Sequence, residues 1–575
     1  MKSSVSELNQ GHPVFPTSEL NELSRNQGSM AAWKHLLATA GAQALADVSG
    51  EFAIGFTDEK GRIFLAVDRF AINSLCYRVD GQTISFARRA DELASPSDEI
   101  DPQAIYDYFY FHVIPSPRTI FKNVFRLPAG HYAIFDHGVL TIRRFWTPEF
   151  NPIEKPSFDG LRSEFRQLLA KAVEGQLDGT KPGCFLSGGT DSSTVAGMIS
   201  EVSGRQAATY SIGFEAEGYD EMEYARIAAK RFGTEHHEYY VTPEDLVRSI
   251  PKVAQYYDQP FGNSSALPAY YCAAMAKADG ISRILAGDGG DELFGGNSRY
   301  AKQQLFGHYQ SVPAILRSGI LEPLLLHTPL GGLPLAKKGC SYIEQAKVPM
   351  PDRNQLYNML HRLGTGNIFT ASFLESVDLD SPLKQQREVW SAALADTDTN
   401  RELAYDWRYT LAECDLPKVV GTTKLAGISV GFPLLDRNLL YFSMRLPNSY
   451  KLNGQKLRWF FKEALRGFLP DEILIKKKQG FGLPFGVWAL KNKALNELAH
   501  DSVLGLVKRG IMRADFVDAL FKTHLAEHPG YYGEMIWLAT MLEQWLRGRT
   551  YIGEKRSGPV QLDRNSVFLG DFSAG

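Results

Sequence analysis

The sequence predicts a mixed α/β protein with a β-rich first domain, a second domain built on a parallel sheet, and a helical extension. Three observations support this prediction. Short β-type runs broken by Gly, Asp and Pro fill residues 1–150. From about residue 158, helical and strand-like segments alternate, which favours a parallel sheet with right-handed crossovers. Beyond residue 300 the pattern is mostly helical, and we expect this part to enclose a site.

In the first domain, we expect strands at residues 52–56, 62–67 and 83–87, arranged as a sandwich layer. A stretch with three prolines, residues 147–156, then precedes a long amphipathic pattern that begins near Phe158. This composition change predicts the domain boundary. We therefore divide the chain into a first domain of residues 1–150, a second of residues 158–550 and a C-terminal tail of residues 551–575.

In the second domain, four strands are expected, and the chain between the first three reads as helix. The strands are residues 184–186, 208–214, 237–241 and 282–286, and one of the helices is residues 222–232. Parallel sheets of this kind bind ligands at the carboxyl ends of their strands. The turns that follow the first and the fourth strand are therefore the places to look for a site.

The turn after the first strand, residues 187–193, reads as an anion cradle. Gly188 and Gly189 let backbone N–H groups approach a ligand closely, and Asp191 in the first helical turn could hold a metal that faces bound phosphates. No Walker A or dinucleotide fingerprint is present, and an ordinary polar turn is the alternative. Hydroxyl groups around the turn come from Ser187, Thr190, Ser192 and Ser193.

Two further loops carry charge beside glycines. Residues 287–296 combine carboxylates with five glycines, which suits magnesium bound to a nucleotide. The spacing of a calcium loop is absent, and a solvated turn is the bland alternative. Residues 474–484 place three lysines before a glycine-rich turn, where a lysine could neutralise departing pyrophosphate or simply be solvated.

The bulk composition limits the classes of protein to consider. The 575 residues can form two or three domains with a large core, and 44% hydrophobic and 22% charged residues are ordinary for a soluble protein. A formal net charge of -3 predicts no nucleic-acid partner. No run approaches the roughly 18 apolar residues of a membrane span, and no signal pattern opens the chain. We expect a cytoplasmic protein with no membrane partner.

The cysteines are scattered, and they include no Cys-x-x-Cys pair. Neither a disulfide framework nor a zinc cluster is predicted from Cys76, Cys184, Cys272, Cys340 and Cys414. Each is expected to be a small buried hydrophobic residue rather than a nucleophile.

With these loops in place, the chain resembles the asparagine synthetase family over nearly its whole length. Members pair an N-terminal glutaminase domain with a C-terminal synthetase domain of the ATP pyrophosphatase type. The likeness is strongest at residues 187–193, 211–214, 288–296, 433–436 and 478–481. It implies a truncated, Ntn-like αββα sandwich followed by an adenine nucleotide α-hydrolase-like domain.

The resemblance implies a site for ATP and Mg²⁺. Asp191 and Asp291 would ligate the metal, and Lys478 would stabilise the reaction centre. Asp288 is the candidate general base, although relatives that form asparagine often have glutamate at that position. The residues implied to bind ATP are Phe185, Ser187, Gly188, Gly189, Asp191, Ser192, Ser193, Gly287 and Ile212, the last through its backbone at the adenine.

The implied reaction has two steps. A carboxylate of a small molecule or peptide attacks the α-phosphorus of ATP, which gives an acyl-adenylate and pyrophosphate. Ammonia or another amine then displaces AMP to form an amide. Adenylation is needed because a carboxylate is otherwise a poor acyl donor, and a cation offsets the charge on the leaving pyrophosphate. Asparagine formation is the default substrate expectation, and a homodimer is possible.

The first domain departs from the glutaminase pattern. Lys2 stands where the family has its N-terminal cysteine nucleophile, and Arg88 and Arg89 replace a Ser-Glu pair. Residues 10–12 replace an Asn-Gly-Glu, and Ser29 stands where an aspartate binds glutamine. We infer a retained scaffold without glutamine hydrolysis, and a start codon placed too late is the competing explanation.

The second domain also departs from the family pattern. Ser429 and Gly431 replace charged residues, and residues 258–268, a predicted pocket wall, contain no arginine for an amino-acid carboxylate. Lasso-peptide cyclisation, β-lactam synthetase-like closure and amidation of a polysaccharide or metabolite therefore stay open beside asparagine formation. A non-catalytic nucleotide-binding descendant is less favoured, because the loop residues are retained. A tRNA or sulfur-transfer enzyme would need a cysteine pair or a basic face, and the sequence has neither.

Overall fold

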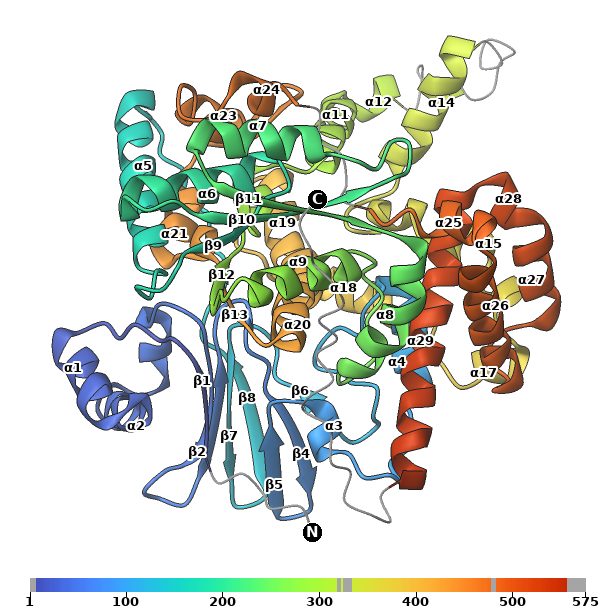
Figure 1. Cartoon of the computed structure of the whole chain (residues 1–575), viewed down its shortest axis with the longest axis horizontal. Coiled ribbons are helices and arrows are strands. Elements are labelled where there is room, and N and C mark those ends of the chain that lie inside the picture. Colours follow the sequence, from blue (N-terminus) through green and yellow to red (C-terminus); the bar gives the residue numbers. More distant parts are fainter. Residues whose placement is uncertain (1–6, 318–321, 324–333, 477–481, 556–575) are drawn as a thin grey trace.

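The computed structural model describes residues 7–317, 322–323, 334–476 and 482–555 (Figure 1). The first domain contains two antiparallel sheets. One has the order β1-β2-β3-β7-β8 and the other the order β5-β4-β6. The strands are β1 (Glu7–Gly11), β2 (Phe52–Thr57), β3 (Ile63–Val67), β4 (Cys76–Asp80), β5 (Thr83–Ala87), β6 (Phe125–Arg126), β7 (His131–Asp136) and β8 (Val139–Arg144).

The two sheets pack face to face, and helices cover their outer sides. Leu65 and Ala133 of the larger sheet share one buried cluster with Tyr77 and Phe86 of the smaller sheet. The outer face of the larger sheet packs against α1 (Ser18–Gln27) and α2 (Ser29–Ala40), where Trp33 is fully buried. On the other side lie α3 (Ala90–Leu93) and α4 (Pro102–Phe111). The predicted αββα layering is therefore present, and all three predicted strands are found within it.

The second domain contains a five-stranded parallel sheet of order β11-β10-β9-β12-β13. All four predicted strands are present. They are β9 (Gly183–Phe185), β10 (Ala208–Phe214), β11 (Glu235–Val241) and β12 (Arg283–Leu285), while the fifth strand, β13 (Ser429–Gly431), was not predicted. Three residues that end in glycine are too short for any periodicity to mark them. Every residue of β10 is buried, which suits a strand inside a covered parallel sheet.

Helices flank this sheet, as an alternating pattern requires (Figure 1). The Ser157 hydroxyl caps α5 by accepting the Gly160 N–H at 3.3 Å, so this helix begins where the amphipathic pattern begins. Helix α7 has the predicted bounds. The helices between and beside the strands are α5 (Phe158–Glu174), α6 (Thr190–Ser203), α7 (Met222–Phe232), α8 (Pro243–Tyr256) and α9 (Ala266–Ala278).

The described chain beyond residue 300 is almost entirely helical, as predicted. A π-helix at Trp407–Asp415 joins α19 to α20 without a break. The last helix passes residue 550 and continues to Lys555. The longer helices of this extension are α11 (Ser298–Ser311), α14 (Pro334–Lys347), α18 (Ser381–Ala392), α19 (Asp398–Asp406), α20 (Leu416–Ala426), α21 (Arg437–Arg445), α26 (Lys493–Lys508) and α29 (Pro529–Lys555).

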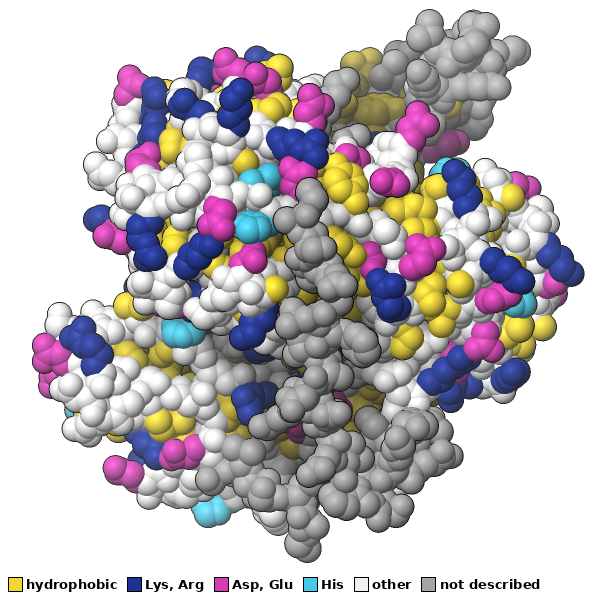
Figure 2. Space-filling model, viewed as in Figure 1, with side chains coloured by type: hydrophobic (Ala, Val, Ile, Leu, Met, Phe, Trp, Pro, Cys, Tyr) yellow, Lys and Arg dark blue, Asp and Glu magenta, His cyan; other side chains and the backbone are white. Residues whose placement is uncertain are grey.

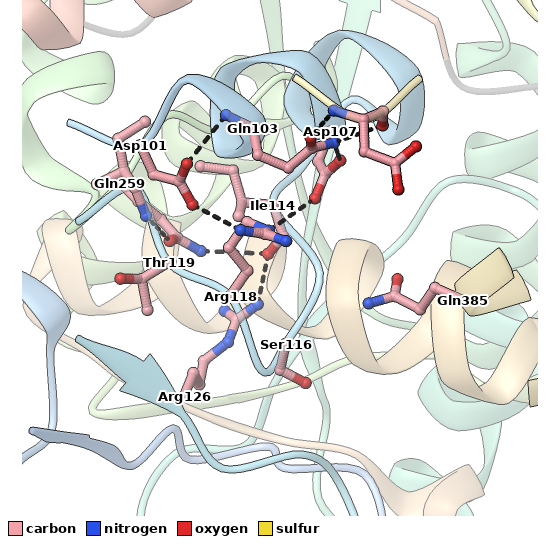
Figure 3. Close-up of polar contacts among 12 residues, drawn as sticks. Asp101, Gln103, Asp107, Ile114, Ser116, Arg118, Thr119, Arg126, Gln259 and Gln385 are labelled. Carbon is pink, nitrogen blue, oxygen red and sulfur yellow. Dashed lines mark hydrogen bonds and ion pairs between the residues drawn. The ribbon is translucent and has the colours of Figure 1, made fainter. Parts of the chain in front are cut away.

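The first domain is built into the second through residues 101–126. Tyr108 and Phe121 belong to the large core of the second domain, and the Tyr108 hydroxyl donates to the Leu538 carbonyl at 2.9 Å. Figure 3 shows Gln259 held against this segment, where its side chain donates to the Ile114 carbonyl at 3.4 Å. Ser116 and Arg126, also drawn there, both contact the buried Glu413 of the π-helix.

The surface seen in Figure 2 mixes charges of both signs, with described basic and acidic side chains interspersed over it. Within the described residues, no helix combines the length and the apolar character that crossing a bilayer requires.

Candidate functional site

Hydrogen bonds between serine residues of the same turn stabilise the turn between β9 and α6. Ser187 and Ser192 lie side by side, with their Oγ atoms 3.0 Å apart, and the Ser187 N–H donates to the Ser192 Oγ at 3.1 Å. Gly188 has a φ of +68°, and a side chain there would overlap the backbone of α7. Gly189 precedes α6 and gives it no side-chain cap. A turn of this shape presents backbone N–H groups at a helix N-terminus, which suits an anion.

The turn after β12 packs directly against the first turn. A side chain at Gly287 would overlap the backbone at Asp191 and Ser192, and one at Gly290 would overlap the Asp191 carboxylate. Gly289 has a φ of +104° at the start of the short helix α10 (Gly290–Phe294). The glycines therefore permit the close approach of the two loops. The sequence shows that glycine is frequent in both loops, but not that the loops are in contact.

The other predicted nucleotide residues lie around these turns. Phe185 ends β9, and Ile212 lies buried on the neighbouring β10. The Ser211 hydroxyl of β10 donates to the Leu186 carbonyl and ties that strand to the first turn. Ser193 is fully buried in α6, and its hydroxyl has no hydrogen-bond partner among the described residues. Lys478 lies outside the described residues.

Asp191 and Asp291 converge on one cation, the guanidinium of Arg458. Arg458 binds both oxygens of Asp191, at 2.6 and 2.7 Å, and also forms an ion pair with Asp291. A further hydrogen bond joins it to the Thr190 hydroxyl at 2.5 Å. Its side chain is only 6% exposed. Arg458 immediately precedes α23 (Trp459–Ala464) and has a φ of +52°, an unfavourable conformation that its contacts with the two aspartates help to maintain.

This donor set fits a magnesium ion bound together with a nucleotide. Mg²⁺ prefers oxygen ligands and is commonly bound through one or two carboxylates, with phosphates and water completing its shell. Asp191 and Asp291 supply two carboxylates that face the same point. Within the described ranges, no group of three or more metal-ligating side chains exists, so phosphate oxygens would have to complete the shell.

Asp288 lies on the side of the site nearest the helical extension. Burial raises the pKa of Asp288 to about 6, and the charge of Lys418 acts in the opposite direction. The Lys418 Nζ lies 3.7 Å from the Asp288 carboxylate and 2.9 Å from that of Asp415, the last residue of the π-helix. Asn263 donates to Asp415 at 3.3 Å. Sequence reasoning had placed Asn263 in a pocket wall but had missed Lys418, Asp415 and Arg458, which no motif marks.

The predicted basic loop is described only in part. Lys476, the first of its three lysines, forms an ion pair with Glu221 at 2.9 Å and lies over the ring of Tyr224 at 4.3 Å. Both partners come from the beginning of α7, whose backbone packs against Gly188. The described end of the basic loop is therefore fixed next to the first turn.

No cysteine among the described residues of the first domain has an exposed thiol. Cys76 is fully buried, and burial raises the pKa of its thiol well above the usual range. His12 contacts Glu51 at 2.9 Å. Arg89 binds Asp91 through two 2.9 Å hydrogen bonds and donates to the Tyr256 carbonyl of the second domain at 2.7 Å. Arg89 therefore joins the two domains.

Comparisons with known proteins match both halves of the chain. Residues 164–547 match the family described as asparagine synthase, and residues 29–146 match a glutamine amidotransferase domain. The chain is 26% identical to the glutamine-hydrolysing asparagine synthetase 1 of Bacillus subtilis, over 90% of this chain and 80% of that protein.

Two further relatives show the range of the similarity. A putative glutamine-hydrolysing asparagine synthetase 2 of Methanocaldococcus jannaschii is 36% identical, over 46% of this chain and 52% of that protein. The amidase chry2 of Gibberella zeae is 25% identical, over 85% of this chain and 76% of that protein.

Proposed function

Because the chain belongs to the asparagine synthase family, we propose that it is an ATP-dependent ligase that activates a carboxylate and joins it to an amine. The observation that carries the proposal is the convergence of Asp191 and Asp291 on one cation position, directly beside the turn closed by Ser187 and Ser192. The same turn and the same two carboxylates would hold the triphosphate of ATP with its magnesium. A substrate carboxylate would attack the α-phosphorus and release pyrophosphate.

The described residues have distinct roles in this reaction. Backbone N–H groups and hydroxyls of the first turn bind and orient the triphosphate. Magnesium held by Asp191 and Asp291 would neutralise phosphate charge. Asp288 accepts the proton that the amine loses as its nitrogen bonds to the acyl carbon, while the bond from that carbon to AMP breaks. Lys418 keeps the Asp288 carboxylate ionised at neutral pH.

We propose ammonia or another amine, rather than glutamine, as the nitrogen source. Cys76 is buried, and Arg89 is engaged between the domains instead of lying free for a ligand. Aspartate is the default carboxylate, because the relatives that match include proteins named asparagine synthetase. Because a fungal relative bears a different name, amidase, we keep the other amide-forming reactions in the experimental panel.

The test is pyrophosphate release from magnesium and ATP with a panel of carboxylates, each assayed with ammonium, primary amines and glutamine. The proposal expects release that depends on one carboxylate and an amide product that contains its acyl group. Failure of the protein to bind ATP would contradict the proposal. Pyrophosphate release that no carboxylate stimulates, together with the absence of any amide product across the panel, would also contradict it.

The rate of amide formation should depend on pH through Asp288. Since the pKa of Asp288 is raised to about 6, the base is ionised above that pH and protonated below it. At a constant concentration of unprotonated amine, the rate should therefore fall about tenfold for each pH unit below 6. In Lys418→Met the cation that lowers this pKa is absent, so the acid limb should move to higher pH.

The pH–rate profiles of Lys418→Met and Lys418→Arg are compared with the same amine. Protonation of the amine then affects both profiles equally, so it does not contribute to the difference between them. The arginine variant should keep its acid limb close to that of the wild type. If the acid limb of the pH–rate profile of Lys418→Met stays in place or moves to lower pH, Asp288 is not the general base.

The first domain should not supply nitrogen from glutamine. Replacing Cys76 with alanine should leave the ammonium-dependent rate unchanged, because the thiol is fully buried and protonated at neutral pH. Glutamine at millimolar concentration should not replace ammonium. Glutamate release coupled to amide formation, measured by chromatography, would show that this domain is a working glutaminase.

A further inference from the structure

A cavity of about 370 Å³ lies between the two sequence domains. One wall is the segment that follows α3 in the first domain. The others come from the end of α8, from Arg509 directly after α26, and from α29 of the helical extension. Figure 1 shows α29 passing beside α8 towards the first domain. None of the nucleotide-loop residues lines this cavity. Its volume falls within the roughly 300–1,000 Å³ that is typical of small-molecule sites.

The acidic and the basic residues that line the cavity come from different domains. Asp91 and Asp98 lie on the side of the first domain, and Arg509 and Arg549 lie on the side of the helical extension. Each is fixed by a partner within the chain, which pre-organises the site. These partners are Arg89 for Asp91 at 2.9 Å, Arg78 for Asp98 at 2.7 Å, Glu543 for Arg509 at 2.7 Å, and the Ser95 carbonyl for Arg549 at 2.8 Å.

Two aromatic residues, Tyr257 and Trp545, also line the cavity. The Trp545 indole N–H already donates to the Tyr257 carbonyl at 2.9 Å. The Tyr257 hydroxyl donates to the Lys418 carbonyl at 3.1 Å. Because the polar groups of both rings are engaged elsewhere, these rings offer a ligand apolar surface.

We propose that this cavity binds a free α-amino acid with an apolar side chain, at a site separate from the reaction centre. Its ammonium group would face Asp91 and Asp98, its carboxylate would face Arg509 and Arg549, and its side chain would lie against Trp545. A nucleotide could place phosphate against the two arginines, but it has no ammonium group to pair with the two aspartates. A simple amine could interact only with the two aspartates, and a simple carboxylate only with the two arginines.

This site gives a role to an unusual feature of the sequence. Arg89, which stands where glutaminases of the family have glutamate, holds the Asp91 carboxylate with two of its three hydrogen bonds. Its guanidinium also lies over the ring of Tyr256, at 5.5 Å, next to the cavity residue Tyr257. The residue that argues against a glutamine site therefore positions one of the two aspartates of the proposed amino-acid site.

The test is calorimetric titration of the full chain, without ATP, with L-phenylalanine and L-leucine. Phenethylamine and 3-phenylpropionate serve as probes that keep only one of the two charges. The proposal expects saturable binding of at least one amino acid, with the single-charge analogues weaker by about tenfold or more. The absence of saturable amino-acid binding, or equal affinity for the single-charge analogues, would overturn it.

Variants then locate the binding. Asp91→Asn and Arg509→Gln should each weaken it about fivefold or more, a coupling of roughly 1 kcal/mol. In Arg509→Gln, the Glu543 carboxylate loses Arg509 but keeps its ion pair with Arg547, which is 3.0 Å away. Glu92→Gln, an exposed position on the same short helix, should bind normally.

A blocking variant and a parallel measurement of ATP binding complete the test. If the charge variants fail to fold, Pro96→Trp at the exposed rim should block the cavity instead. Unchanged affinity in Pro96→Trp or in both charge variants would overturn the assignment. ATP binding, measured in parallel, should be unaffected by Asp91→Asn, so failure of this inference is distinguishable from failure of the proposed ligase function.

Discussion

Replacing Asp191 or Asp291 with asparagine is expected to reduce pyrophosphate release from ATP by at least about a hundredfold. Asparagine keeps the shape of the side chain and removes its charge, so the loops should still pack while the magnesium site loses a ligand. Both carboxylates face the position that Arg458 occupies and are less than 20% exposed, at 19% and 18%. The measurement is steady-state pyrophosphate release, with ATP affinity measured separately with and without magnesium.

A matched control is available on another helix. Asp159 lies in the first turn of α5, as Asp191 lies in the first turn of α6, but it is exposed and far from any glycine loop in sequence. Asp159→Asn should retain the wild-type rate. If Asp191→Asn and Asp291→Asn also retain it across a range of magnesium concentrations, the two aspartates do not hold the metal.

Arg458→Met is expected to destabilise the protein by about 3–5 kcal/mol in the absence of magnesium, because it removes the cation that two largely buried carboxylates share. Arg458 also donates to the Thr190 hydroxyl, and that contact is lost as well. Adding magnesium with ATP should recover much of the loss, since the ion can replace the missing positive charge. Chemical denaturation with and without magnesium and ATP measures both effects.

Arg458→Lys separates the effect of charge from that of geometry. Lysine keeps the positive charge but cannot bind Asp191 through two parallel hydrogen bonds, so we expect an intermediate loss of stability. Equal stability of Arg458→Met and the wild type, with the same response to magnesium, would show that the carboxylates do not need a cation between them.

The parts of the site that could be predicted are those encoded by local sequence. The first turn combines glycines with hydroxyls between a strand and a helix, and the second combines glycines with carboxylates after another strand. Strand order then brings both turns to one edge, because β9 and β12 are neighbours in the sheet. The helix at residues 222–232 was also predictable, since its apolar residues recur with helical spacing.

The missing parts depend on contacts between distant segments. Arg458 lies 267 residues from Asp191 in sequence, and nothing in its surroundings distinguishes it from a solvated arginine. Lys418 and Asp415 lie at the junction of a π-helix and α20, where no motif marks them. Strand β13 has three residues and joins the sheet only by pairing with β12. Tertiary packing, rather than local propensity, determines all of these features.

The most direct test of the account is the identity of the nucleotide products. Single-turnover reactions with ATP labelled at the α-phosphate, magnesium, the active carboxylate and ammonium should yield AMP and pyrophosphate in equal amounts. Oxygen-18 from the labelled carboxylate should appear in the AMP, because the carboxylate attacks the α-phosphorus. Formation of ADP and inorganic phosphate, or AMP without oxygen-18, would contradict adenylation of the carboxylate and with it the proposed function.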